Sequence, residues 1–360
     1  MDDISGIELS RRFYAELVAP WLGRAFPALR HAAALIGSGS ELLGFDDAMS
    51  RDHDWGPRVT IFVSEADFAA QGEAIVEAFA AAAPADFLGH PLSLKRTRDG
   101  EIAGVRRDPR HGLEVHTLEA MLRRTLALEP GEPHDALTWL GLSEQRLLTM
   151  TAGAVFHDDD GRLTSLRERL AAFPRDVRLY KLACQWRRIA EEQAFVGRTG
   201  DLGDDLGSRV VTARLVRDAM RMAFLIEGRY TPYPKWFGAA FARMPCAPEL
   251  TPLLERAVAA SDWRDREAAL ADAYRRLAKL QLARGLPGAE PVVGPFHDRP
   301  FLVINADVIG AAVAAEIADP ALRTLPIIGS LDQVTDSTPV IEAPERARRA
   351  MVALFDDGKA

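Results

Sequence analysis

Cysteine is scarce in this chain, which has only Cys184 and Cys246 among its 360 residues. These residues form neither a metal-ligand spacing nor the framework of a disulfide-rich secreted protein, and such scarcity is typical of a reducing compartment. The sequence also lacks any apolar run near the roughly 20 residues that a membrane-spanning helix needs. Its first residues are acidic and lack the basic region of a signal peptide, so we expect a cytoplasmic protein with no membrane partner.

An excess of basic charge is missing as well. The chain has 44 Lys and Arg residues against 52 Asp and Glu residues, a formal net charge of −8. This balance argues against bulk electrostatic binding to nucleic acid or to an anionic membrane, although it leaves room for a local basic patch. Internal repeats and low-complexity segments are absent too. The hydrophobic share of 48% and the length predict a globular chain with room for two domains.

The most informative stretch spans residues 36–63 and has three parts. What we interpret as a helix end leads into a glycine-serine turn at residues 37–40. The triplet Asp52-His53-Asp54 follows twelve residues later, and the β-branched run at residues 59–63 predicts a strand. The rest of the chain is interpreted around this stretch.

The paired aspartates predict a metal site. Residues two apart on an extended chain point the same way, with Cα atoms roughly 6.5 Å apart, so Asp52 and Asp54 can converge. Two carboxylates about 5 Å apart repel by roughly 3 kcal/mol at an effective dielectric of about 20, and Mg²⁺ relieves that repulsion. Gly39 and Ser40 in the turn offer backbone N–H groups and a hydroxyl to phosphate. Both patterns also occur in ordinary surface turns, but their order ahead of a strand favours nucleotidyl transfer.

The phrases GSGSELLGFDD and SRDHDWGPR resemble the signature of the DNA polymerase β-like nucleotidyltransferase superfamily. They are similar in particular to an uncharacterised bacterial nucleotidyltransferase-like family. The resemblance implies two Mg²⁺ ions, a nucleoside triphosphate co-substrate and a third carboxylate on a neighbouring strand. The spacer departs from the pattern, because it is slightly long and carries the extra acids Asp46 and Asp47. Arg51 in this spacer is a candidate for phosphate or for a salt bridge to either acid.

The best match to the third carboxylate is Glu114. Residues 111–118 predict a second core strand, with Leu113 and Val115 on one face and Glu114 and His116 on the other. Glu114 would join Asp52 and Asp54 as a metal ligand; the alternative is a solvent-facing glutamate on an edge strand. His116 fits a surface position or a place beside the ligands better than a ligand role. The acidic run at residues 158–160 cannot converge on one ion, because neighbours on a strand point apart, and we expect it in an exposed turn.

The chain is mainly helical from residue 163 onward, apart from an expected loop at residues 197–207. The predicted fold class is α+β, with a nucleotidyltransferase-like mixed sheet and flanking helices at residues 1–145. A mainly helical domain at residues 146–360 would close the nucleotide and acceptor site. Arg214 and Lys235 on its helices are candidates for the triphosphate, while Lys235 could equally be a solvated lysine beside Trp236.

Two functions compete. The first is a metal-dependent nucleotidyltransferase that moves NMP from ATP or another NTP to a hydroxyl of an unidentified acceptor, with a small molecule favoured. The second is a nucleotide-binding regulatory module that has lost this chemistry; the presence of both Asp52 and Asp54 favours the enzyme. Nucleotide addition to RNA is disfavoured by the net charge of −8. The nucleobase, the acceptor and the oligomeric state are not specified by the sequence.

Overall fold

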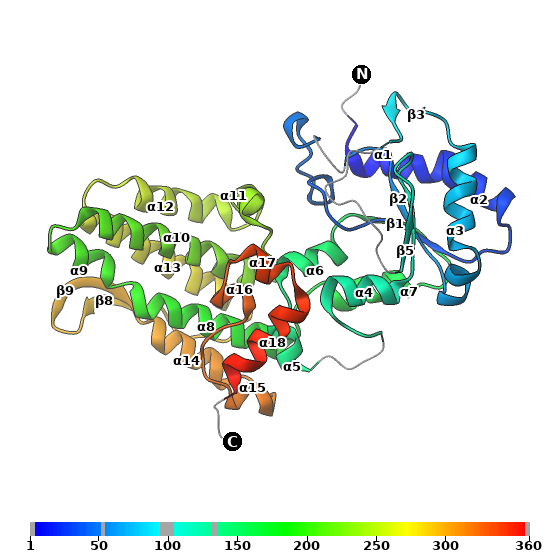
Figure 1. Ribbon diagram of the computed structural model, residues 1–360. Helices are drawn as coiled ribbons and strands as arrows, with labels where there is room; N and C mark the ends of the chain where they lie inside the picture. The colour runs from blue at the N-terminus through cyan, green and yellow to red at the C-terminus, as the bar shows by residue number, and fades with distance from the viewer. Residues whose placement is uncertain (1–3, 52–54, 94–103, 131–134, 357–360) are drawn as a thin grey trace. The chain divides into compact units, whose positions relative to one another are not determined.

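The computed structural model describes residues 4–51, 55–93, 104–130 and 135–356 (Figure 1). The chain forms two compact units: the sheet unit, residues 1–133 and 146–171, and the helical unit, residues 134–145 and 172–360. Of the three boundaries between these segments, the one between residues 145 and 146 falls within α6 (Glu144–Thr151). The chain therefore leaves the sheet unit, returns to it and leaves it again, whereas the sequence suggested one boundary near residue 145.

A five-stranded mixed sheet forms the centre of the sheet unit, in the order β5-β6-β2-β1-β7. Its strands are β1 (Ala32–Leu35), β2 (Val59–Phe62), β5 (Val105–Arg107), β6 (Leu113–His116) and β7 (Ala154–Asp158). β2 and β6 are parallel, and the other neighbouring pairs are antiparallel. A separate two-stranded hairpin consists of β3 (Asp86–Phe87) and β4 (His90–Pro91). The expected mixed sheet with flanking helices is confirmed.

The register of the sheet brings distant segments to the same end of the strands. Ala34 lies opposite Thr60 in the antiparallel β1–β2 pair, so the end of β1 lies beside the start of β2. Thr60 lies opposite Glu114 in the parallel β2–β6 pair, so β6 begins at the same end of the sheet. Residues 37–40 come shortly after β1 and therefore lie at the end of the sheet where β2 and β6 begin.

Helices cover one face of the sheet. They are α1 (Gly6–Arg12), the π-helical turn η1 (Phe13–Val18), α2 (Ala19–Ala25) and α3 (Glu65–Ala82), which Figure 1 shows beside the sheet. The aromatic residues Phe13, Trp21 and Phe79 pack in one core with Ile61 and Val115 of the strands. η1 precedes Pro20, which has no N–H to close an α-helical bond, and the wider turn accommodates this loss. These N-terminal helices support the sheet from that face.

The remaining helical segments of the sheet unit are η2 (Glu41–Leu43), η3 (Ala48–Arg51), α4 (Leu118–Leu126), most of α6 and α7 (Arg162–Leu170). Arg167 from α7 donates to the carbonyl oxygens of Met150, Thr151 and Ala152 at 2.7–3.2 Å. These bonds satisfy carbonyl groups at the end of α6, where no N–H of the helix can reach them. Burial lowers the pKa of Arg167 without removing its charge.

Two sequence interpretations in the sheet unit are wrong. The residues before the turn at 37–40 are not a helix end but β1, which is buried and paired on both sides by β2 and β7. Pairing within the sheet overrides the helix propensity of its alanines. Residues 154–158 form β7 at the edge of the sheet, so Asp158, the first acid of the run expected in an exposed turn, lies on a strand. In both cases the deciding partner is distant in the sequence.

The helical unit is built around α8, which packs against α10 and α14 (Figure 1). Its helices are α5 (Ala136–Leu140), α8 (Arg175–Glu192), α9 (Phe195–Asp201), α10 (Asp205–Glu227), α11 (Pro234–Ala242), α12 (Ala247–Ala259), α13 (Trp263–Ala283), α14 (Ala306–Ala315), α15 (Pro320–Thr324), α16 (Leu331–Val334), α17 (Thr338–Ile341) and α18 (Pro344–Phe355). It also contains the hairpin of β8 (Val293–Phe296) and β9 (Arg299–Ile304). None of the helices that the structure describes combines the length and apolar character needed to cross a membrane.

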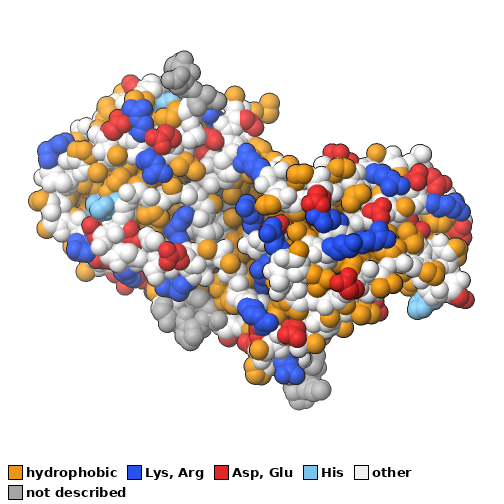
Figure 2. Space-filling model, turned by 180° about the vertical axis from the view of Figure 1, so that it is seen from behind, with side chains coloured by type: hydrophobic (Ala, Val, Ile, Leu, Met, Phe, Trp, Pro, Cys, Tyr) orange, Lys and Arg blue, Asp and Glu red, His pale blue; other side chains and the backbone are white. Residues whose placement is uncertain are grey.

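The expected loop at residues 197–207 is wrong, because α9 and the start of α10 occupy most of it. A Cβ on Gly200 in α9 would clash with Trp263 at the start of α13, so the close packing of these two helices requires glycine there. On the surface of this unit, basic and acidic side chains are interspersed in the view of Figure 2. Ion pairs within one helix of this unit include Arg187 with Glu191 and Arg209 with Asp205.

Candidate functional site

The turn that follows β1 has the backbone geometry that glycine permits. Gly37 and Gly39 have φ angles of 112° and 137°, a region that residues with a Cβ rarely adopt. A Cβ on Gly39 would also clash with the Glu41 carboxylate and the Arg58 guanidinium. The glycine at position 39 is therefore required both by the backbone conformation and by the side chains packed against it.

Two backbone donors of this turn are available to a ligand. Gly37 donates its N–H to the carbonyl oxygen of Thr149 at 3.2 Å. Within the described part of the chain, the backbone N–H groups of Ser38 and Gly39 donate no hydrogen bond, and Ser38 is exposed. Successive N–H groups in a turn with positive φ form a concave site that binds anions. The predicted phosphate turn thus presents the donors that a phosphate oxygen needs.

A buried ion pair holds the turn in place. Arg58, the residue before β2, donates from Nε to Glu41 at 3.0 Å and from Nη2 to the carbonyl oxygen of Ser38 at 2.6 Å. The side chains of Glu41 and Arg58 are 3% and 16% exposed. Sequence reasoning missed this pair, although opposite charges directly after the turn and directly before the strand were a usable signal. The pair joins the end of β1 to the start of β2.

The extra acids of the spacer have structural roles. The Asp46 carboxylate accepts from the N–H of Gly6 at 2.7 Å, at the start of α1, and from the Trp55 indole at 3.1 Å. Asp47 accepts from backbone N–H groups two and three residues on, which stabilises η3. Arg51 donates to the carbonyl oxygen of Asp46 at 2.9 Å and lies 4.6 Å over the Trp55 ring. The longer spacer is therefore anchored to the N-terminus of α1, where the helix dipole favours an anion.

Asp52 and Asp54, the predicted metal ligands, lie outside the described residues, together with His53. The chain is described again from Trp55, and β2 begins at Val59. The predicted strand after the paired aspartates is confirmed, while their roles as ligands stay predictions.

Glu114 lies in the interior of the sheet. It is on β6 between β5 and β2, opposite Arg107 on one side and Thr60 on the other, so the alternative of an edge strand is wrong. Its side chain is 23% exposed and lies 2.9 Å from the Nε2 atom of His116. Leu113 and Val115 enter the core on the opposite face, as predicted. The carboxylate thus keeps access to solvent near the end of the sheet that carries the turn.

His116 is buried, which excludes the surface position that the sequence left open. Burial lowers the pKa of His116, with the Glu114 carboxylate opposing that shift, so the ring is neutral at pH 7. A neutral ring donates from one nitrogen, and the geometry assigns that proton to Nε2, which faces Glu114. His116 therefore orients the Glu114 carboxylate, as a residue beside a metal ligand commonly does.

The candidate cations of the helical unit are exposed. Arg214 on α10 pairs with Glu192 at 2.9 Å, and its side chain is 55% exposed. Lys235 is exposed at the start of α11, after Pro234, with its Nζ atom 4.7 Å from the ring centre of Trp236. Gly39, Ser40 and Glu114 belong to the sheet unit and Arg214 and Lys235 to the helical unit, so a shared role toward one nucleotide stays a prediction.

Residues 139–237 match the model of a family described as a domain of unknown function, DUF4037. The match covers α8 and α10 and ends within α11, so it includes both Arg214 and Lys235. It supports the expected resemblance to an uncharacterised family, while membership of the DNA polymerase β-like superfamily stays a prediction. No curated protein matches the chain.

A solved structure similar to this chain is that of a nucleotidyltransferase-like protein from Exiguobacterium sibiricum 255-15. The two chains are 11% identical, the similarity covers 77% of this chain and 76% of that one, and the TM-score is 0.32. A likeness at this level carries no argument about the activity of this chain.

Proposed function

We propose that this chain transfers a nucleoside monophosphate from an NTP to a hydroxyl of a small-molecule acceptor, in a Mg²⁺-dependent reaction. The observation that carries the proposal is the pair of available N–H groups at Ser38 and Gly39. They lie at the end of the sheet where β2 and β6 begin, and Glu114 is the second residue of β6. Phosphate oxygens would accept from these donors. Ser40, also predicted to contact phosphate, follows them in the turn, and its side chain is buried.

The proposed metal ligands are Asp52, Asp54 and Glu114. Glu114 fits this role because its carboxylate is partly exposed and is held by a neutral, buried imidazole. Carboxylate oxygens are the ligands that Mg²⁺ prefers, and the ions would neutralise charge that develops on the phosphates. Two ions are expected if all three carboxylates contribute.

The proposed reaction replaces a phosphoanhydride bond of the NTP by a phosphoester bond to the acceptor. The acceptor hydroxyl oxygen bonds to the α-phosphorus, the bond from that phosphorus to the bridging oxygen breaks, and pyrophosphate leaves. The hydroxyl proton passes to solvent or to a carboxylate of the site. Arg214 and Lys235 are proposed to offset the charge on the leaving pyrophosphate.

The test is transfer of label. Each NTP labelled at its α-phosphate is incubated with the protein, Mg²⁺ and the small-molecule fraction of a cell extract. The wild type should label a discrete acceptor, and Asp52→Ala, Asp54→Ala and Glu114→Gln should each lower the rate by about 100-fold or more, which corresponds to about 2.7 kcal/mol. Glu129→Gln is the matched control, because Glu129 is exposed and pairs with Arg123 outside the site.

Binding measurements separate the two candidate functions. Calorimetric titration with ATP and GTP should show affinity that depends on Mg²⁺, because the carboxylates repel an unaccompanied triphosphate. Tight NTP binding without any label transfer would favour the regulatory module. Equal affinity in EDTA, or no NTP binding at all, would overturn the metal-dependent proposal.

A further inference from the structure

A cluster of metal-binding side chains lies at the other end of β1 from the candidate nucleotide turn. His31 immediately precedes β1, His157 lies on β7, and Asp159 follows β7 directly. β1 and β7 are antiparallel, with Ala32 opposite Asp158, so the start of one strand lies beside the end of the other. Three residues from two distant segments of the chain therefore meet at one point of the sheet unit.

A β-bulge aims His157 at this point. Ala33 lies opposite His157 and Ala34 lies opposite Val155, so Phe156 is the extra residue on β7. In a regular strand, neighbouring side chains point to opposite faces. Here the rings of Phe156 and His157 both lie 6.2 Å from the ring of Tyr14. The bulge thus brings His157 to the side of the sheet that carries His31, with 4.7 Å between the two imidazole centres.

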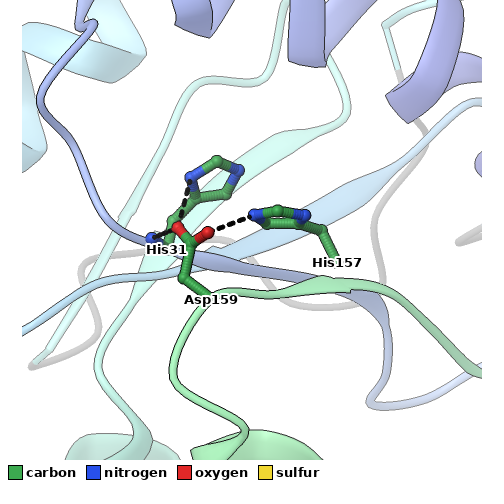
Figure 3. A group of neighbouring side chains, drawn as sticks. All are labelled: His31, His157 and Asp159. Carbon is green, nitrogen blue, oxygen red and sulfur yellow. Dashed lines mark hydrogen bonds and ion pairs between the residues drawn. The ribbon is translucent and has the colours of Figure 1, made fainter.

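The donor atoms are close enough to share one ion. The Nε2 atom of His157 lies 2.9 Å from one carboxylate oxygen of Asp159, and the Nδ1 atom of His31 lies 3.9 Å from the other. All three donor atoms lie within 4.8 Å of one another, and Figure 3 shows both rings and the carboxylate directed toward one another. Ligand bonds of about 2.0–2.2 Å place the donors of a tetrahedral zinc site roughly 3.4 Å apart. Shifts of about one ångström would complete such a site.

We propose that His31, His157 and Asp159 bind one Zn²⁺ ion that joins the start of β1 to the end of β7. Two imidazole nitrogens and one carboxylate oxygen are a donor set that suits zinc rather than Mg²⁺, which prefers oxygen ligands. The side chains of His157 and Asp159 are 39% and 29% exposed, so a metal can enter and water can fill a fourth position. This site is separate from the proposed Mg²⁺ site and does not depend on nucleotidyl transfer.

The surroundings of His31 favour binding through its Nδ1 atom. The Tyr14 hydroxyl lies 3.0 Å from Nε2, and this bond orients the ring as an outer hydrogen bond commonly does for a metal-bound histidine. The backbone N–H of His31 donates to the Asp159 carboxylate at 2.8 Å, which fixes the position of that ligand. Nδ1 is 3.3 Å from the carbonyl oxygen of Leu29, a long contact that metal binding would replace.

The other two acids of the run at residues 158–160 have different partners. Asp158 accepts from the N–H of Thr164 at 2.8 Å, in the first turn of α7. Asp160 forms an ion pair with Arg30. The three carboxylates therefore diverge, as the sequence predicted, and only Asp159 belongs to the histidine cluster. The sequence signal that was missed is the histidine two residues before this aspartate.

The test is zinc binding by tag-free, chelator-treated protein, measured by calorimetry and by competition with a chromophoric chelator in excess Mg²⁺. We expect one Zn²⁺ per chain. His157→Ala and Asp159→Asn should each weaken binding by about 10- to 100-fold or more. Asp160→Asn is the matched control and should bind as the wild type does. Co²⁺ in place of Zn²⁺ should give the visible absorption of a tetrahedral site with nitrogen ligands, and His157→Ala should lose it.

Circular dichroism of each variant establishes that it is folded, and the half-exposed position of His157 favours that outcome. The proposal is overturned if the wild type binds no Zn²⁺, if His157→Ala binds it unchanged, or if Asp160→Asn weakens binding equally. Label transfer in Mg²⁺ without zinc is a separate measurement, so failure of one proposal leaves the other standing.

Discussion

At the scale of single residues, Gly39 is the most constrained position of the candidate nucleotide turn. Gly39→Ala places a Cβ against Glu41 and Arg58 at a φ of 137°, so the turn must rearrange. We expect ATP affinity in Mg²⁺ to fall by about tenfold or more, and the free energy of unfolding to fall by about 1–3 kcal/mol. Calorimetric titration and denaturant unfolding measure the two effects.

The control is Gly37→Ala, which shares the positive φ of 112° but has no atom within 4 Å of its added Cβ. It should cost stability through the backbone alone, with a smaller loss of affinity. Equal affinities for wild type and Gly39→Ala would show that the turn does not bind nucleotide.

Glu267 on α13 is a residue whose charge destabilises the helical unit. Burial raises the pKa of Glu267 to about 7, and its Oε1 atom has no hydrogen-bond partner among the described residues. A carboxyl whose pKa is higher in the folded than in the unfolded protein lowers the free energy of unfolding as the pH rises from 4.5, its ordinary pKa, to about 7. The full cost is present above pH 7. Glu267→Gln should therefore raise the free energy of unfolding at pH 8 by about 1–3 kcal/mol, at about 1.4 kcal/mol per pKa unit.

Urea unfolding at pH 8 and pH 4.5 tests this sign. The stabilising effect of Glu267→Gln should shrink at the lower pH, where the carboxyl of the wild type is protonated. Asp307→Asn, at an exposed position of α14, serves as a control that should show no such dependence. A Glu267→Gln effect that is equal at both pH values would refute the buried-charge explanation.

At the scale of elements, α8 is tied to its neighbours by a buried lysine. The Lys181 ammonium lies 2.9 Å from Glu144, 2.8 Å from the Ser330 hydroxyl and 4.2 Å from the ring centre of Phe173. The nearby carboxyl of Asp332 has its pKa raised to about 6 by burial and by Glu144. Lys181, together with the partly buried guanidinium of Arg221, therefore offsets the charge of two acids in the interior.

Lys181→Met should lower the free energy of unfolding by about 3–5 kcal/mol, because it leaves a buried carboxylate without its partner. Lys279→Met on α13 is the matched control, since Lys279 is exposed and its loss should change stability by less than about 0.5 kcal/mol. Thermal and urea unfolding of the two variants provide the comparison. Similar stabilities for both would show that the interior acids are protonated or hydrated instead.

The elements that were predicted correctly carry their signal locally. The alternation from Leu113 to His116 has a period of two residues, so it identified both the strand and the face that carries Glu114. β1 and β7 were misread because neither is recognisable without its partner: short alanine-rich or polar segments become strands only when a sheet pairs them. The Glu41–Arg58 pair was missed although its charges follow the turn and precede the strand, because the two side chains meet only after β1 and β2 pair.

At the scale of the whole molecule, the sequence indicated a sheet-containing part followed by a helical part, but not the path between them. Residues 146–171 return to the sheet unit because β7 completes the sheet beside β1. The composition of this segment resembles that of the helices after it, so no change near residue 171 marked its end. The position of a boundary depends on long-range pairing, which composition does not report.

Whether the helical unit takes part in nucleotide binding is the question that Lys235 can answer. Lys235 stands exposed at the start of α11 with its ammonium group over Trp236, a position compatible with both a phosphate ligand and a solvated lysine. If it meets the β- or γ-phosphate, Lys235→Ala should weaken NTP binding by about 10- to 100-fold, the equivalent of a charge-assisted hydrogen bond of about 1.5–3 kcal/mol. NMP binding should be unchanged, because NMP lacks both phosphates.

Arginine at this position should restore affinity only partly, since a planar guanidinium does not replace a point charge at a fixed place. Lys279→Ala is the matched control for the loss of an exposed lysine elsewhere in the same unit. Calorimetry with ATP and AMP distinguishes the outcomes, because a general electrostatic effect would weaken both ligands and appear in both variants. Unchanged ATP affinity in Lys235→Ala would mean that Lys235 is solvated, and nucleotide binding would then be assigned to the sheet unit without it.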